Sequence, residues 1–471
     1  MRQLAEPAKL FKSATGRRYG EMLSAFTNSF KIPELRARIL FTMGLIFVCR
    51  IVANVPIAGV DPLALQRLIA DVEKSSGGGM LGLLDMFSGG ALSNCAVGAL
   101  GIMPYISSSI ILQLLTAVVP TLGRLSREGD SGRQKITQYS RILTVFLCII
   151  QGWFLAITLE NPGSMGLNHQ IVLNPGLGFK FMTVVSVTAG SMFIMWLGEQ
   201  ITQRGIGNGI SLIITEGIVS RLPSAVAYAI QMFTAVEGVR QFNPIFSVIL
   251  LVALFAVVAG TILLTQGQRK IPVQYAKRVV GRKVYGGQST YMPLRVNYSG
   301  VMPIIFAQSL LMFPAIILRR FPESWTWAHA LANQLGPDAL FHMILYGVMI
   351  LFFSYFWVAT QFNPVQIADD LKKYGGYVPG VRPGRPTAEF LDSTMTKITL
   401  AGALFLTVIA VIPTIMNRQF DVPSLVASFF GGTSLLITVG VMLDTMRQVE
   451  SHLLMRHYDG FLRKGKLRGR R

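Results

Sequence analysis

The sequence predicts an all-α integral membrane protein with ten transmembrane helices, and three observations lead to this fold class. First, 51% of the 471 residues are hydrophobic and only 14% are charged, whereas a soluble domain carries about a quarter charged residues. Second, apolar stretches recur along the chain, close in length to the roughly 20 residues that a helix needs to cross a bilayer. Third, basic residues are concentrated in alternate connections between these stretches.

The apolar stretches give the order of the predicted helices. They cover residues 39–55, 98–118, 142–159, 179–197, 209–222, 245–264, 301–318, 340–362, 398–413 and 425–443. Several contain Gly or Pro, which bilayer helices tolerate when neighbouring groups satisfy the freed backbone. The fifth stretch is the shortest, so hydropathy alone supports it least.

The distribution of Lys and Arg orients these helices. Of the 43 basic residues, 34 lie in the two terminal tails and the even-numbered connections, and 8 lie in the odd-numbered connections. Basic residues are retained on the cytoplasmic side of a membrane, so both termini are expected in the cytoplasm. This topology also accounts for the net charge of +20, and no specific DNA binding is expected.

The predicted helices divide the chain into two halves with basic tails. Residues 1–38 form a cytoplasmic tail, 39–222 a first five-helix half, 223–443 a second five-helix half, and 444–471 a cytoplasmic tail. Five helices in each half give the halves opposite orientations, as in proteins built from inverted repeats around a central path.

One connection in the first half is unusual. Residues 80–92, MLGLLDMFSGGAL, are too short and glycine-rich to cross a membrane and too apolar for an exposed loop. A re-entrant segment packed inside the protein satisfies both constraints. A structural turn before the second helix is the alternative.

The sequence offers little for catalysis or metal binding. It contains no HExxH, GxSxG or GxxxxGK[ST] motif, which are the marks of common metalloproteases, hydrolases and nucleotide-binding loops. The glycines of GIGNG, residues 205–209, lack the strand–loop–helix context of a dinucleotide site. Cys49, Cys95 and Cys148 have no metal-ligand spacing. We therefore expect no enzyme activity, no cofactor and no metal.

Two charged residues lie clearly inside the apolar stretches, away from their ends. They are Arg50 in the first and Glu216 in the fifth. A carboxylate inside a membrane is costly unless it is paired or hydrated. Arg50 is therefore a candidate partner for Glu216.

Two cytoplasmic connections are long, basic and rich in glycine, proline and aromatic residues. They cover residues 265–300 and 363–397, and their composition favours docking surfaces over plain solvated loops. Arg282, Lys283 and Arg382 are the residues that we expect to contact a partner, because they cap these two loops.

Long motifs in these regions carry a resemblance to a known family. They are FSGGAL at 87–92, LGIMPYISSSIILQLL at 100–115, MWLGEQITQRGIGNGISLII at 195–214, GGQSTYMPLRVNYSGVMPIIFA at 286–307, FNPVQIADDLKKYGGYVPGVRPG at 362–384, and FGGTSLLITVGVMLDT at 430–445. In this order they resemble the SecY family, which supplies the central subunit of the bacterial protein translocase. The tail before residue 31 matches weakly.

The resemblance implies a protein-conducting channel in the bacterial plasma membrane. Such a channel translocates unfolded secretory polypeptides and releases transmembrane segments sideways into lipid. The implied partners are the SecE and SecG subunits, the SecA ATPase, the ribosome, unfolded preproteins with their signal sequences, and membrane lipid.

The resemblance also implies roles for individual residues. A ring of aliphatic side chains would narrow the pore at Ile102, Ile106, Ile214, Ile305 and Ile437, with Ile304 as a competitor for the fourth position. A plug would comprise Phe87, Ser88, Gly89, Gly90, Ala91 and Leu92. A lateral gate would contain Ser107, Gln151 and Asn297, although Ser107 and Gln151 are equally suited to bonding backbone carbonyls.

Three other classes compete with a channel. A secondary transporter with inverted repeats needs ionisable groups near the midplane, and the apolar stretches clearly offer only Arg50 and Glu216. A membrane insertase without a through-pore would need neither ring nor plug. A membrane enzyme would need the catalytic motifs that the sequence lacks.

Overall fold

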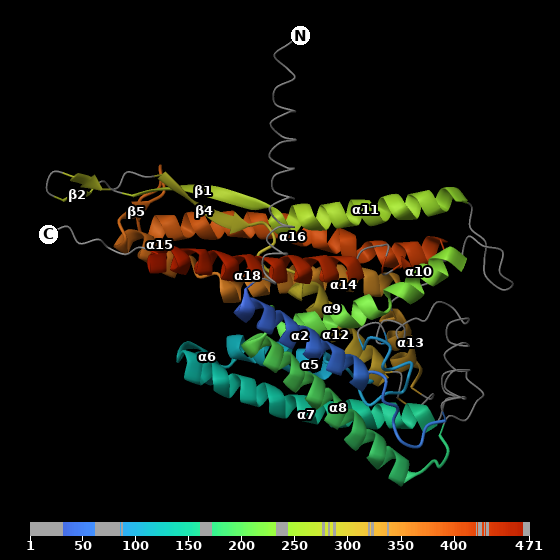
Figure 1. The fold of residues 1–471 in the computed structure, drawn as a ribbon. Coiled ribbons are helices and arrows are strands. Elements are labelled where there is room, and N and C mark those ends of the chain that lie inside the picture. Colours follow the sequence, from blue (N-terminus) through green and yellow to red (C-terminus); the bar gives the residue numbers. More distant parts are fainter. Residues whose placement is uncertain are drawn as a thin grey trace.

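The computed structural model describes residues 32–61, 85, 88–160, 172–231, 244–275, 278–280, 283–285, 289–318, 321, 325–336, 339–420, 422, 426–427, 429 and 433–464. Figure 1 shows helices packed into a bundle, with strands β1 and β4 and helix α15 at one end and helices α10 and α13 at the other.

In the first part of the chain, every predicted apolar stretch overlaps a helix. The elements are α2 (Pro33–Val52), α5 (Met103–Val118), α6 (Pro120–Arg127), α7 (Asp130–Glu160), α8 (Leu177–Arg204), α9 (Gly209–Ser220) and α10 (Leu222–Gln231). The fifth stretch was predicted to end at 222, but α10 continues the apolar run through Gln231. α7 also begins before its predicted start, because its polar first turns extend beyond the apolar part.

The second part of the chain also follows the predicted order. Its helices are α11 (Pro244–Gln266), α12 (Met302–Leu318), α13 (Thr326–Gln334), α14 (Leu340–Gln361), α15 (Pro364–Lys373), α16 (Arg385–Phe420) and α18 (Thr433–Lys464). α14 packs against α12 and α16, and α18 packs against α11 and α9. Contacts between α5 and α12 and between α9 and α18 join the two parts.

Five helical segments among the described residues are long and apolar enough to cross a membrane. They are Asp130–Glu160, Leu177–Arg204, Gly209–Gln231, Leu340–Lys373 and Arg385–Met416. α5 and α6 would add a sixth, but the chain bends by 105° between them. Pro120 causes this bend, because the residue before a proline is driven to extended backbone, as Val119 is. A multi-helix membrane fold is thus supported, and the full number of ten spans stays a prediction.

Two small sheets correct the all-α prediction. β1 (Gln268–Tyr275) lies between β4 (Ser289–Arg295) and β5 (Gly376–Tyr377), and β2 (Arg278–Val280) pairs with β3 (Lys283–Tyr285), all antiparallel. Ile271 and Val273 are buried while their neighbours are more exposed, which is the period of two expected for a strand covered on one face. This alternation is short and lies outside the long apolar stretches from which the fold class was predicted.

The largest hydrophobic core lies where helices from both parts of the chain meet. It contains residues of α5, α8, α9, α12, α14, α16 and α18. A separate cluster beneath the sheet holds Ile271 and Leu294 against Val358, Leu391 and Met395. The sheet is therefore anchored to the bundle and is not a free loop.

Candidate functional site

The five isoleucines predicted for the ring are all buried in the main hydrophobic core. Ile102 immediately precedes α5, Ile106 lies on α5, Ile214 on α9, Ile305 on α12 and Ile437 on α18, and none is more than 4% exposed. All five belong to the same buried cluster. Ile304 belongs to it as well and is fully buried, so the competition at this position remains. Their arrangement as a ring around a pore stays a prediction.

Local backbone contacts place these side chains on four different helices. Ile106 N–H donates to the carbonyl of Ile102 at 3.1 Å, which puts the two side chains one helical turn apart. Gly198 on α8 lies against this core, because a Cβ on Gly198 would lie 3.2 Å from Cδ1 of Ile213 and 3.6 Å from Cδ1 of Ile102. The start of α9 is fixed by Asn208, whose side chain accepts from the N–H of Ile210 at 3.1 Å. Asparagine is a favoured residue at this capping position.

The chemistry of the cluster suits a seal. Branched aliphatic side chains offer no hydrogen bonds to water, so a narrow constriction made of them loses its water and blocks ions. They also provide no directional contacts that would favour one polypeptide sequence over another.

The described part of the predicted plug is a compact turn. Phe87 lies outside the described residues. The N–H of Gly90 donates to the carbonyl of Asp85 at 2.9 Å, and the Ser88 hydroxyl accepts from the N–H of Leu92 at 3.2 Å. Gly89 and Gly90 have φ values of +66° and +89°, which favour glycine. Ala91 is fully buried and contacts Ala53 and Ala96.

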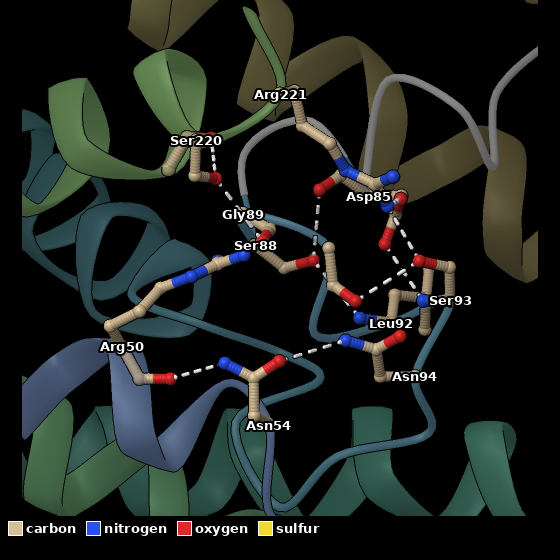
Figure 2. A network of polar contacts seen from close by, with 12 residues as sticks. Arg50, Asn54, Asp85, Ser88, Gly89, Leu92, Ser93, Asn94, Ser220 and Arg221 are labelled. Atoms are coloured by element: carbon tan, nitrogen blue, oxygen red, sulfur yellow. Dashed lines mark hydrogen bonds and ion pairs between the residues drawn. The ribbon is translucent and has the colours of Figure 1, made fainter. Parts of the chain in front are cut away.

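The plug turn rests on α2 and α9. The carbonyl of Gly89 accepts hydrogen bonds from Nη1 of Arg50 and, at 3.3 Å, from the Ser220 hydroxyl (Figure 2). A Cβ on Gly89 would lie 2.9 Å from Cα of Gly217, so the two backbones touch. The turn therefore lies directly against the helix that carries Ile214.

Arg50 has a different main contact from the one that the sequence suggested. Among the described residues it forms no ion pair with Glu216, and its guanidinium donates to the Gly89 carbonyl. The charge of Arg50 still acts on the Glu216 carboxylate, so Arg50 has the predicted electrostatic partner and, in addition, a backbone acceptor on the re-entrant turn. Glu216 is half-buried on α9, two residues after Ile214.

The three predicted gate residues have different surroundings. Asn297 is buried, and its amide donates to the Gly300 carbonyl at 3.0 Å, which fixes the turn before α12. Ser107 and Gln151 are half-buried. No hydrogen bond of the described residues involves either side chain, so neither bonds a described backbone carbonyl.

Ser108 is a residue that sequence reasoning missed. Its hydroxyl lies 2.7 Å from that of Thr144 and donates to the Ser140 carbonyl at 3.0 Å, which ties α5 to α7. The only sequence signal for Ser108 was a second hydroxyl beside Ser107 in an apolar helix. Which of these two serines faces α7 depends on the rotation of α5 about its axis, which the sequence does not give.

The two predicted docking loops form one body. β1 of the first loop pairs with β5 of the second, with Gln274 opposite Tyr377, and the Tyr377 hydroxyl donates to the Gln274 side chain at 3.0 Å. Arg382, in the second of these loops, is exposed. Lys283 lies in β3, and Arg282 lies outside the described residues.

The described residues contain no group of three or more His, Cys, Asp or Glu side chains that could hold a metal ion. Cys49, Cys95 and Cys148 are free thiols, and all are buried.

Comparison with known proteins places these features in a family. The SecY family model matches residues 96–446. The protein translocase subunit SecY of Escherichia coli is 47% identical over 443 residues, covering 93% of this chain and 96% of that one. The corresponding subunit of Streptomyces coelicolor is 46% identical over 448 residues, covering 94% and 100%.

Solved structures share the fold at low sequence identity. A structure described as a protein conducting channel aligns with a TM-score of 0.57 at 16% identity, covering 88% of this chain and 91% of that chain. Sec61 in the canine ribosome–channel complex aligns with a TM-score of 0.53 at 15% identity over the same shares.

Proposed function

The chain belongs to the SecY family, and on this premise we propose that it is the protein-conducting channel subunit of a translocase. It moves unfolded secretory polypeptides across the bacterial plasma membrane and releases transmembrane segments laterally into lipid. The observation that carries this proposal is that Ile102, Ile106, Ile214, Ile305 and Ile437 are all buried in the hydrophobic core where the two parts of the chain meet. The plug turn lies against α9, which carries Ile214.

The proposed architecture has ten transmembrane helices in two inverted halves, residues 39–222 and 223–443, around the pore. Support comes from the overlap of every predicted stretch with a helix and from the α5–α12 and α9–α18 contacts between halves. The asymmetry of basic residues supports cytoplasmic termini, which places β1, β4 and α15 on the cytoplasmic side.

The proposed plug, residues 80–92, closes the funnel on the side opposite to the sheet. Its contact with Gly217 and its hydrogen bonds to Arg50 and Ser220 support a seated position. Because no described residue of this segment belongs to the main hydrophobic core, the segment can leave without unfolding the bundle.

The proposed lateral gate is the seam between α5 and α7 on one side and α12 and α14 on the other. Ser108 joins α5 to α7, while α12 packs against α14, so each side holds together while the seam parts. A signal sequence or a nascent helix is apolar, and it enters lipid only when this wall opens.

The proposed docking surface is the joined sheet with Lys283, Arg282 and Arg382. SecA or the ribosome binds there, and the smaller SecE and SecG subunits pack on the apolar exterior of the bundle. Arginine suits such a surface because its planar guanidinium can form two parallel hydrogen bonds to one carboxylate or phosphate.

A crosslinking experiment tests the through-pore. Cys49, Cys95 and Cys148 are first replaced, and single cysteines are then introduced as Ile106→Cys and Ile437→Cys. A preprotein that carries its own cysteine is arrested in transit by a folded carboxy-terminal domain. Both ring cysteines are expected to form a disulfide with the arrested chain.

Phe47→Cys is the matched control, because Phe47 lies on α2 and is 67% exposed on the outside of the bundle. It is expected to give no crosslink. Equal crosslinking at Phe47, or none at the two ring positions during continued export, would overturn the proposed pore.

A further inference from the structure

A second arginine, distinct from Arg50, reaches the plug turn. Arg221 follows the last residue of α9, in the middle of the apolar run Gly209–Gln231. Its guanidinium forms an ion pair with the carboxylate of Asp85 and donates to the Ser93 hydroxyl at 2.5 Å (Figure 2). The side chains of Arg221 and Asp85 are only 18% and 15% exposed.

Asp85 also organises the turn that it anchors. Its carboxylate accepts from the N–H of Ser93 at 2.7 Å, and its carbonyl accepts from the N–H of Gly90 at 2.9 Å. Arg221 and Ser93 therefore meet the same carboxylate from two sides. Any force that moves Arg221 relative to Asp85 therefore also acts on Gly90 and Ser93 of the turn.

Gly90 makes room for this contact. A Cβ on Gly90 would lie 3.1 Å from Cζ of Arg221, so a side chain there would push the guanidinium away. The positive φ of Gly90 and its closeness to Arg221 thus both favour glycine at this position.

The apolar surroundings of Arg221 and Asp85 make their ion pair important for the position of the turn. Ionisable groups inside an apolar span are costly, and they are tolerated when paired or when they face water. Removing one partner of a mostly buried ion pair leaves an uncompensated charge and costs more than the pair itself contributes. The closed position of the turn is therefore the one in which both charges are satisfied by protein.

We propose that the Arg221–Asp85 ion pair is a latch that holds the plug turn closed and sets how strongly a signal sequence must act to open the channel. This inference rests on the proposed function. Opening separates the carboxylate on the turn from the guanidinium on α9, and water entering the funnel hydrates both. Arg50 provides a second contact, which is weaker because it binds a backbone carbonyl.

The test compares charge variants in the reconstituted complex. Arg221→Ala and Asp85→Asn each remove the ion pair, and the double substitution Asp85→Arg with Arg221→Asp reverses it. Asp85→Asn keeps the size of the side chain and an acceptor for Ser93, so it reports the lost charge even if Arg221→Ala fails to fold. Lys180→Ala is the control, since Lys180, in the first turn of α8, pairs at 2.9 Å with Glu160 at the end of α7 and contacts no described plug residue.

Two readouts are measured, resting ion conductance in planar bilayers and export of a reporter with a defective signal sequence. Asp85→Asn and Arg221→Ala are expected to raise both about tenfold, which corresponds to about 1.4 kcal/mol of lost closed-state preference. The reversed pair is expected to return both to within about twofold of the parent, and Lys180→Ala to leave both unchanged.

The outcomes separate the latch from the channel. If the parent exports a reporter with an intact signal sequence but the single variants match it in both readouts, the latch is wrong and the channel stands. Failure of the reversed pair to restore closure also overturns the latch, because the single variants then act through packing and not charge. If the parent exports no reporter at all, the proposed function itself fails.

Discussion

The backbone of Gly89 lies against the backbone of Gly217, with 2.9 Å between Cα of Gly217 and the position that a Cβ on Gly89 would take. A side chain at Gly89 would have to displace the plug turn from α9, because neither backbone can shift alone. This contact joins the proposed plug directly to a helix of the proposed ring.

Gly89→Val is therefore expected to unseat the plug. The valine side chain would clash with the backbone of Gly217. It would also be strained by the φ of +66° at this position, which a β-branched residue rarely adopts. Resting conductance in planar bilayers should rise, tenfold for each 1.4 kcal/mol lost from the closed state. Gly129→Ala is the control, since Gly129 also has a positive φ but no atom within 4 Å of its Cβ position; an equal leak in it would contradict the contact argument.

Deletion of residues 86–92 tests the plug as a unit. We expect a protein that still folds and leaks ions, because the described part of this segment contributes few side chains to the main core. Thermal unfolding in detergent checks folding, and conductance checks the leak. Conductance equal to that of the parent would argue against a plug, and loss of folding would favour a structural turn.

The ring is expected to seal because it is apolar. Ile437→Asn changes the side-chain volume little but adds hydrogen-bonding groups, which stabilise water in the constriction. Both resting leak and export of substrates with defective signal sequences should increase. Ile437→Val, which stays branched and apolar, should change neither. An Asn variant as tight and selective as the parent would place Ile437 in ordinary core.

The joined sheet is expected to bind the motor through Arg382. Arg382→Glu should abolish SecA-driven export while the protein still inserts and folds, since a carboxylate repels the acidic groups that an arginine binds. Export by the purified complex with SecA and ATP is the measurement. Arg385→Glu is a neighbouring control, although it also breaks the exposed ion pair with Glu389. Full export by Arg382→Glu would remove this residue from the docking surface.

The glycine at the start of α9 is expected to matter for stability. A Cβ on Gly209 would lie 2.0 Å from the carbonyl oxygen of Gly198, and overpacking of this kind costs about 1–3 kcal/mol or more. Gly209→Ala should lower the unfolding temperature in detergent. Gly178→Ala, on α8 with nothing within 4 Å of its Cβ position, should raise it slightly, because alanine favours helix over glycine.

The sequence by itself determined the broad fold and the family. Long apolar stretches can satisfy their backbone in lipid only as helices, so hydropathy located the helices, and the imbalance of Lys and Arg predicted their orientation. Motifs of up to 23 residues carried the resemblance that the family match and the 47% identity bear out. The exposed ends were less predictable, because the polar first turns of α7 and the strand alternation at Ile271 and Val273 lie outside the apolar pattern.

Only the tertiary structure decided which polar groups meet. Arg50 donates to the Gly89 carbonyl, Arg221 pairs with Asp85, and Gln274 lies opposite Tyr377 across two loops. Each pair is separated by tens of residues or more, and its formation depends on helix rotation and on where the chain turns back. Hydropathy records how apolar a segment is but not which way each side chain faces. The partners of charged residues inside a membrane protein are therefore settled by packing, after the helices have formed.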